Sequence, residues 1–143
     1  MQTKVIKLYI TKNDEDKTRE TVSSIELDNL GIKNDKFYNK NLQRSILLTS
    51  IDSYELAKEE GIELDYGSLG ENILMSGNPY HLKEGECLVI GETTLEITQN
   101  CTLCKGLSSV NSKLPKLLKN DRGIFAKVIS GDSTIKINDI VKV

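Results

Sequence analysis

Two short apolar runs, at residues 86–90 and 93–98, are separated only by the dipeptide Gly91-Glu92. A two-residue connection that begins with glycine is typical of a tight β-hairpin, because glycine readily adopts the backbone angles of such turns. In the second run Leu95 and Ile97 alternate with polar residues, which indicates a strand with one buried face. The segment therefore predicts a hairpin and, with it, a fold that contains a β-sheet.

The rest of the chain repeats this pattern of short β-type segments. A helix is expected to begin at Ser50 or Asp52, either of which can cap it, and to stop at Gly61. A second short helix is expected within residues 112–120, where Pro115 is tolerated in the first turn. We predict a mainly β fold, a closed or nearly closed β-barrel with one or two short peripheral helices. Besides the hairpin, strands are expected at residues 4–11, 21–27, 43–49, 71–75, 124–129, 134–137 and 140–143.

The composition describes one folded domain that spans residues 1–143. The 19 basic and 21 acidic residues give a net charge of -2, so no overall positive field attracts nucleic acid or anionic lipid. No stretch approaches the roughly 20 apolar residues that a membrane span needs, and the N-terminus lacks the apolar core of a secretion signal. Three cysteines, an odd number, in a chain without an export signal predict reduced thiols and a cytoplasmic location.

A loop rich in polar groups precedes the hairpin. Residues 67–72 read G-S-L-G-E-N, and we call this stretch the acid–amide loop. Glycine allows a backbone to approach a ligand closely, while Glu71 and Asn72 supply hydrogen-bond acceptors and a donor. The alternative interpretation is a simple turn, in which Asn72 caps its own loop.

Several motifs, in this order along the chain, are similar to the MOSC domain family, which is named after the C-terminal domain of molybdenum-cofactor sulfurases. No single motif is specific, but their order along most of the chain supports the resemblance. The family implies a β-barrel that binds the pterin-based molybdenum cofactor. The motifs are G-I-K-N-D at 31–35, Q-R-S-I-L-L at 43–48, G-S-L-G-E-N at 67–72, G-E-C-L-V-I-G at 85–91, L-E-I-T-Q at 95–99 with a cysteine at 104, R-G-I-F-A-K-V at 122–128 and I-N-D-I-V at 137–141.

Cys104 is the leading candidate for chemistry. It lies just beyond the predicted strand at 93–98, and the neighbouring Lys105 favours the thiolate, the form that binds metals or attacks electrophiles. The resemblance implies that Cys104 binds the molybdenum of the cofactor or holds transferred sulfur as a persulfide. The alternative is a cysteine that packs as a small apolar residue.

The resemblance also implies a set of residues that hold the cofactor. Gly70, Glu71 and Asn72 would contact the edge of the pterin ring. The chain has three arginines against sixteen lysines, and two of them, Arg44 and Arg122, fall in the motifs. A planar guanidinium suits a bidentate contact with phosphate, so both are predicted to bind the cofactor's phosphate, with help from Lys33 or Lys105. For Arg122 the alternative is a solvent-exposed turn.

Cys101 forms a C-x-x-C pair with Cys104, which departs from the family pattern of a basic residue and a proline within this motif. A structural zinc site would need four ligands, and only Cys87 and His81 remain to complete it, so zinc is not expected. A further hypothesis is that Cys101 resolves an oxidised or persulfidated Cys104. His81, the only histidine, is interpreted as a structural or surface residue.

These observations predict a protein that binds molybdenum cofactor and acts as a carrier of cofactor or sulfur through Cys104. The alternative is a molybdenum-dependent oxidoreductase that reduces N-hydroxylated substrates, and a domain that has lost the cofactor and serves as a scaffold is a third interpretation. The sequence does not decide whether the protein is an enzyme. Expected partners are the pterin cofactor and proteins of cofactor biosynthesis or molybdoenzymes, with neither nucleic acid nor membrane.

Overall fold

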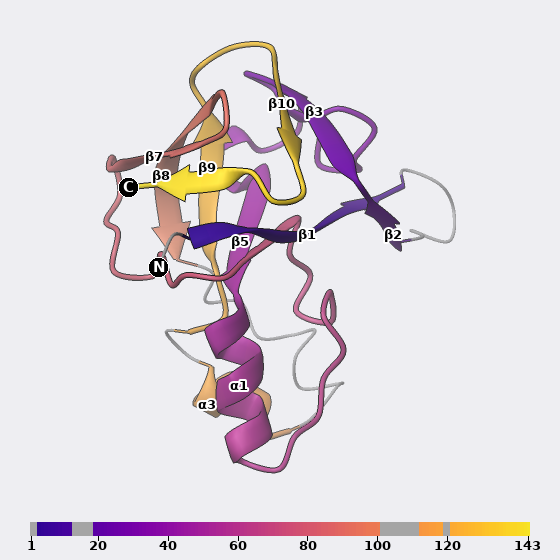
Figure 1. Cartoon of the computed structure of the whole chain (residues 1–143), viewed down its shortest axis with the longest axis vertical. Coiled ribbons are helices and arrows are strands. Elements are labelled where there is room, and N and C mark those ends of the chain that lie inside the picture. Colours follow the sequence, from indigo (N-terminus) through magenta and orange to yellow (C-terminus); the bar gives the residue numbers. More distant parts are fainter. Residues whose placement is uncertain (1–2, 13–18, 101–111, 119–120) are drawn as a thin grey trace.

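A sheet that closes on itself forms the centre of the computed structural model, which describes residues 3–12, 19–100, 112–118 and 121–143 (Figure 1). Its strands are β1 (Thr3–Thr11), β2 (Arg19–Val22), β5 (Ile46–Ser50), β6 (Ile73–Met75), β7 (Cys87–Ile90), β8 (Thr93–Asn100), β9 (Ile124–Val128) and β11 (Ile140–Lys142). Within the described residues, seven of them follow one another in the order β11-β7-β8-β9-β5-β6-β1, and pairing of β1 with β11 closes the ring. β2 pairs with β1 outside the ring. The predicted mainly β fold with a closed barrel is confirmed.

A second, smaller sheet covers part of the barrel. It consists of β3 (Ser24–Asp28), β4 (Gly31–Ile32) and β10 (Ser133–Lys136), in the order β10-β3-β4. Its apolar residues Ile25, Leu27 and Ile135 belong to the same core as the barrel interior. The sequence predicted one strand at 21–27, whereas the structure divides this stretch at Ser23 between the two sheets. The two halves separate because β2 pairs with β1 while β3 pairs with β10.

Two helices lie together at one end of the barrel, α1 (Ile51–Glu59) and α3 (Leu114–Leu117) (Figure 1). Ser50 is the N-cap of α1, because its side chain accepts a hydrogen bond from the Asp52 N–H. α1 connects β5 to β6, which are parallel and therefore need such a crossover. The helices and the barrel end enclose a second apolar core, which includes Tyr54, Ala57, Leu69, Leu74, Leu114 and Leu118. None of the helices in the described part of the chain combines the length and the apolar character that crossing a membrane requires.

A single turn of 3-10 helix, η1 (Leu42–Arg44), precedes β5 where the sequence predicted that a strand had already begun. Asn41 caps this turn by accepting a hydrogen bond from the N–H of Gln43. Within β5, Ile46 and Leu48 are fully buried in the barrel core. Leu47 faces the opposite side of the strand and packs with Phe125 of β9 in a separate cluster. The Leu47–Phe125 pair therefore belongs to the outer wall of the barrel.

Asn72 joins three distant parts of the chain just before β6. Its side-chain oxygen accepts a hydrogen bond from the N–H of Leu47 at 3.0 Å, and its amide nitrogen donates to the carbonyl of Tyr9 at 3.3 Å. The same nitrogen lies 3.5 Å from the carboxylate of Asp35, which also accepts from the N–H of Thr11 at 2.7 Å. Asn72 is only 4% exposed. It therefore satisfies backbone groups of β5 and β1 that water cannot reach.

Replacement of Asn72 by alanine is expected to lower the free energy of unfolding by about 2–4 kcal/mol, because it leaves two buried backbone groups without their side-chain partner. Urea unfolding followed by circular dichroism measures the loss. Asn78→Ala is the matched control, since Asn78 is exposed and accepts a single hydrogen bond, from the N–H of Tyr80. Equal losses in the two variants would contradict the role assigned to Asn72.

Candidate functional site

The predicted catalytic and metal-binding residue, Cys104, lies outside the described residues, as do Lys105 and Cys101. Asn100 ends β8 and is the last described residue before this segment. It pairs with Ile124 at the start of β9, two residues after Arg122. The last described residue before the segment that contains Cys104 therefore lies beside Ile124, two residues along the chain from Arg122, one of the predicted cofactor-binding residues.

A lateral row of residues connects the acid–amide loop with the end of β8. Asn72 exchanges backbone and side-chain hydrogen bonds with Leu47 of β5. Leu47 pairs with Phe125 of β9, and Phe125 pairs with Gln99 of β8. The row crosses three strand spacings, which amount to about 14 Å. The acid–amide loop and the strand that leads to Cys104 therefore lie at the same level of the barrel wall.

The carboxylate of Glu71 lies inside the acid–amide loop and is 0% exposed. Its Oε2 accepts hydrogen bonds from the Tyr54 hydroxyl at 2.6 Å and from the Gly67 N–H at 3.2 Å. Burial, and then the charge of Glu71, raise the pKa of Tyr54 well above its ordinary value. The phenol therefore keeps its proton and donates a hydrogen bond to the carboxylate. The second carboxylate oxygen, Oε1, is also buried and has no hydrogen-bond partner among the described residues.

The two glycines of the loop lie close to different side chains. Gly67 has φ +96°, and a Cβ there would lie 3.0 Å from the ring of Tyr9. Gly70 has φ +86°, and a Cβ there would lie 3.9 Å from Nη2 of Arg122. Both backbone conformations favour glycine. The structure thus places Gly70, Glu71 and Arg122, all predicted as cofactor-binding residues, next to one another.

Arg122 is tied to the loop and to the barrel by separate contacts. Its Nη2 donates to the carbonyl of Leu69 at 3.3 Å. Its own carbonyl accepts hydrogen bonds from the hydroxyls of Thr49, at 3.0 Å, and Tyr80, at 3.4 Å. The following residue, Gly123, packs so closely on β5 that a Cβ would lie 2.9 Å from the carbonyl oxygen of Leu48. These contacts fix the backbone from which the Arg122 side chain extends.

Tyr80 is the centre of the network that holds Arg122. Its hydroxyl accepts from the Ser50 N–H at 2.8 Å and lies 2.6 Å from the hydroxyl of Ser53. Ser53 in turn donates to the carbonyl of Asp121. Burial raises the pKa of Tyr80 to about 12. The start of α1 and the segment before β9 are thereby joined through one phenol.

Arg44 lies on the opposite side of the Leu47–Phe125 pair from Arg122. It precedes β5, whereas Arg122 precedes β9, and these two strands are antiparallel. The Arg44 guanidinium is stacked over the Phe125 ring, 4.8 Å from its centroid. The two arginines that were predicted to bind phosphate are therefore not in contact. A ligand that touched both would have to extend across Leu47 and Phe125.

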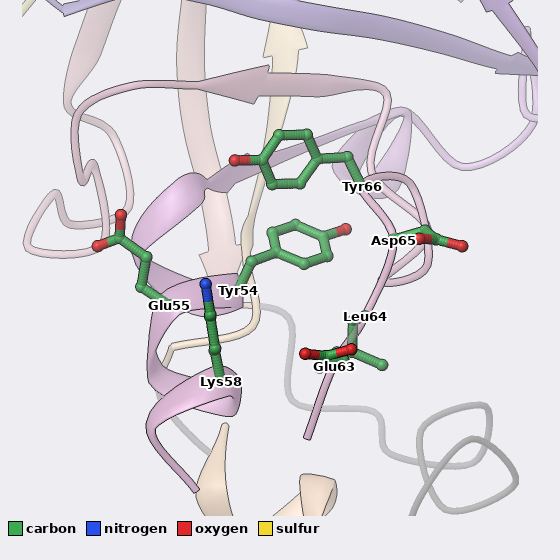
Figure 2. A pocket seen from close by; sticks show the side chains of 7 residues that line it. All are labelled: Tyr54, Glu55, Lys58, Glu63, Leu64, Asp65 and Tyr66. Carbon is green, nitrogen blue, oxygen red and sulfur yellow. The ribbon is translucent and has the colours of Figure 1, made fainter. Parts of the chain in front are cut away.

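A cavity of about 520 Å³ lies between α1 and the segment that follows it (Figure 2). Two of its walls are the rings of Tyr54 and Tyr66, which meet edge to face with centroids 5.0 Å apart. Carboxylates outnumber the one lysine around it, so the cavity does not suit a phosphate group. Its lining residues are Tyr54, Glu55, Lys58, Glu63, Leu64, Asp65 and Tyr66.

Cys87 and His81 are both exposed. Within the ranges that the structure describes, no group of three or more His, Cys, Asp or Glu residues is arranged to hold a metal ion. Cys104, the predicted metal ligand, lies outside those ranges.

Three residues of the site were not identified from the sequence: Tyr54, Tyr80 and Arg19. Tyr54 lies in the segment that the sequence predicts as a helix, and nothing in its spacing indicates a hydrogen bond to Glu71. Tyr80 lies next to His81 and belongs to none of the motifs. Arg19 was the one arginine outside the family-like motifs, and its rarity in a lysine-rich chain was the available signal.

The raised pKa of Tyr80 predicts a specific loss of stability at alkaline pH. Because the folded protein holds this proton more tightly than the unfolded chain, Tyr80 favours folding below pH 10 and loses this contribution as the pH rises towards 12. A shift of two units corresponds to about 3 kcal/mol of unfolding free energy. Urea unfolding at pH 9.5 and pH 11.5 should show a smaller loss in Tyr80→Phe than in the wild type, while exposed Tyr66→Phe should match the wild type. The same loss in all three proteins would refute the assignment.

Comparisons with known proteins agree with this fold. The structure of YuaD from Bacillus subtilis superposes with a TM-score of 0.82 at 20% identity, over 99% of this chain and 94% of YuaD. YiiM from Geobacillus stearothermophilus gives a TM-score of 0.73 at 15% identity, over 98% of this chain and 74% of that one. YiiM from Escherichia coli gives 0.73 at 19% identity, over 99% and 69%. No curated protein sequence gives a significant match. The family model of the MOSC domain matches residues 34–142, so the chain belongs to the MOSC domain family.

Proposed function

We propose that this protein binds molybdenum cofactor and carries the cofactor, or sulfur, through Cys104. The MOSC family is associated with binding of this cofactor. The observation that carries the proposal is the meeting of three features at the start of β9. These are the guanidinium of Arg122, the acid–amide loop that it contacts, and the end of β8 that leads to Cys104.

The described residues fit such a cofactor in charge and in hydrogen bonding. A pterin carries N–H donors, and Glu71 Oε1 is a buried acceptor without a partner among the described residues. A phosphate group needs a cationic partner, which Arg122 supplies next to Gly70. Because Glu71 is fully buried, its direct contact with a pterin stays a prediction.

The side chain of Asn72, predicted to contact the pterin, also has hydrogen-bond partners within the protein. Its oxygen and nitrogen already bond to Leu47 and Tyr9. Direct contact with a pterin therefore remains a prediction, and the hydrogen bonds favour a supporting role, in which Asn72 fixes the neighbouring Glu71. Arg44, whose guanidinium face covers Phe125, would contribute its charge at the far end of the Leu47–Phe125 pair.

Cys104 lies within reach of this place on covalent grounds alone. It follows Asn100 by four residues, and an extended chain spans at most about 14 Å over that length. When bound, the cofactor would supply the molybdenum and its dithiolene sulfurs, to which the protein would add the thiolate of Cys104. The protein's own contribution is to bind the phosphate at Arg122, to orient the pterin beside the acid–amide loop and to present the thiol.

Replacement of Cys104 by alanine tests the role of the thiolate. The variants are produced in a host that synthesises the cofactor, and molybdenum is measured by elemental analysis and pterin by fluorescence after oxidation. Wild type and Cys87→Ala, which lacks the exposed thiol, should retain both, whereas Cys104→Ala should retain at least about tenfold less molybdenum because a metal–thiolate bond is lost. Equal retention in all three would refute the role of Cys104.

The same preparations separate a carrier from an enzyme. Loaded wild-type protein is offered a hydroxylamine-type substrate and an artificial electron donor. The carrier proposal expects retention of the cofactor without turnover. Turnover that is lost in Cys104→Ala would instead establish the oxidoreductase.

Arg122→Gln is expected to weaken cofactor binding by about ten- to a hundredfold, the usual value of a charged hydrogen bond to phosphate. Arg122→Lys should lie between this variant and the wild type, because lysine keeps the charge but not the bidentate geometry. Lys127→Gln is the matched control: Lys127 is a cation on β9 that pairs with Glu96 at 3.2 Å. Dissociation constants can be measured by titration of apoprotein with released cofactor. A loss in Lys127→Gln as large as in Arg122→Gln would contradict the assigned phosphate contact.

A further inference from the structure

Arg19, at the start of β2, binds backbone carbonyls of the acid–amide loop. Its Nη2 donates to the carbonyl of Glu71 at 2.6 Å and to that of Gly67 at 3.3 Å. Its Nη1 donates to the carbonyl of Gly70 at 3.4 Å and to the hydroxyl of Thr11 at 3.2 Å. One guanidinium therefore joins both ends of the loop to β1.

Contacts with β1 fix the position of this guanidinium independently of the loop. The Arg19 backbone pairs with Thr11 in the β1–β2 ladder. Its side chain crosses the ring of Tyr9, with 5.3 Å between the guanidinium carbon and the ring centroid. Gly67 packs on that same ring, where a Cβ would lie 3.0 Å from it. The ring of Tyr9 thus supports both the arginine and the loop.

The loop turns its carbonyl groups and its N–H groups in different directions. Arg19 binds carbonyls at both ends of the loop, and Arg122 binds the carbonyl of Leu69 between them. The N–H groups of Gly67 and Leu69 donate to the Tyr54 hydroxyl, which in turn donates to the Glu71 carboxylate. This arrangement keeps the carboxylate enclosed and the glycine backbone in its left-handed conformation.

An ordinary surface ion pair does not explain Arg19. In the part of the chain that the structure describes, no carboxylate lies within ion-pair distance of it, and its four hydrogen-bond partners are neutral oxygens. A planar fork with two donor ends can reach such a spread of acceptors, whereas the single ammonium of lysine cannot. The chain has sixteen lysines and three arginines, so the presence of an arginine here agrees with a requirement for a guanidinium that reaches all four acceptors.

We infer that Arg19 is a positioning residue, which fixes the acid–amide loop over the buried Glu71 so that Gly70 and Arg122 stay in the arrangement that the ligand meets. The part of this inference that concerns the ligand rests on the proposed cofactor binding. Without Arg19 the carbonyls of Gly67, Gly70 and Glu71 lose the guanidinium that joins them to β1. The two glycines of the loop then allow it to open, and Glu71 becomes accessible to water.

Amide hydrogen exchange in the apoprotein tests the clamp without any cofactor. The N–H groups of Gly67, Leu69 and Gly70 should exchange at least about tenfold faster in Arg19→Gln and in Arg19→Lys than in the wild type. Glu20→Gln is the matched control: Glu20 is the next residue of β2 and makes only a half-exposed ion pair with Lys12, at 3.6 Å. It should leave the loop unchanged.

Three results would overturn the clamp. They are unchanged loop exchange in Arg19→Gln, faster exchange throughout the protein to the same degree as in the loop, and wild-type exchange in Arg19→Lys, which would show that charge alone suffices. Rescue provides an independent readout. Millimolar guanidinium chloride added to Arg19→Ala should slow the loop amides again, and equal ammonium chloride should not. Guanidinium otherwise destabilises folded proteins. If Arg19 only stabilised the protein in general, added guanidinium would therefore not slow the exchange of the loop amides in Arg19→Ala.

Titration with molybdenum cofactor released from a donor molybdoenzyme tests the link to the ligand. The dissociation constant should rise at least about tenfold in Arg19→Gln and remain unchanged in Glu20→Gln. Wild-type affinity in Arg19→Gln would overturn the positioning role. Failure of the wild type itself to bind would instead refute the proposed function, and the exchange experiment would still decide whether Arg19 clamps the loop.

Discussion

The buried amide of Asn72 is the contact on which the geometry of the site depends. It bonds to backbone groups of β5 and β1, which lie far apart in the sequence, and so fixes the point where β6 begins. Two polar backbone groups that water cannot reach make this position costly to change. Glu71 is the preceding residue, so its carboxylate lies in the interior, where the acid–amide loop covers it. The arginines then contact the carbonyls that this loop presents outwards.

Charge is distributed unevenly around the loop. A buried carboxylate is tolerated only with hydrogen-bond donors, and Tyr54 and the Gly67 backbone provide two of them. Tyr54 also lines an acidic cavity beside α1, together with Tyr66 (Figure 2). An anionic ligand therefore finds a favourable field on the side of Arg122 and an unfavourable one in that cavity. This difference supports the proposal that the phosphate of a cofactor binds at the start of β9.

Local patterns predicted the elements whose partners are close in sequence. The β7–β8 hairpin was evident from its alternation and its glycine turn, and the cap of α1 from Ser50. The second sheet was not, because β3 pairs with β10 from the other end of the chain, a choice that no local pattern encodes. The motifs include Glu71 and Arg122, which lie together in the structure. They also include Asn72, whose predicted ligand contact stays a prediction because its amide already bonds to Leu47 and Tyr9. Arg19 belongs to no motif, since its partners are backbone carbonyls that any sequence would supply.

The central claim is that the thiolate of Cys104 reaches the metal of a bound cofactor. X-ray absorption at the molybdenum edge counts the sulfur ligands of that metal directly. We predict that loaded wild-type protein and Cys87→Ser show one sulfur ligand more than the cofactor's own dithiolene supplies, and that Cys104→Ser lacks it. An identical sulfur count in wild type and Cys104→Ser would contradict the account.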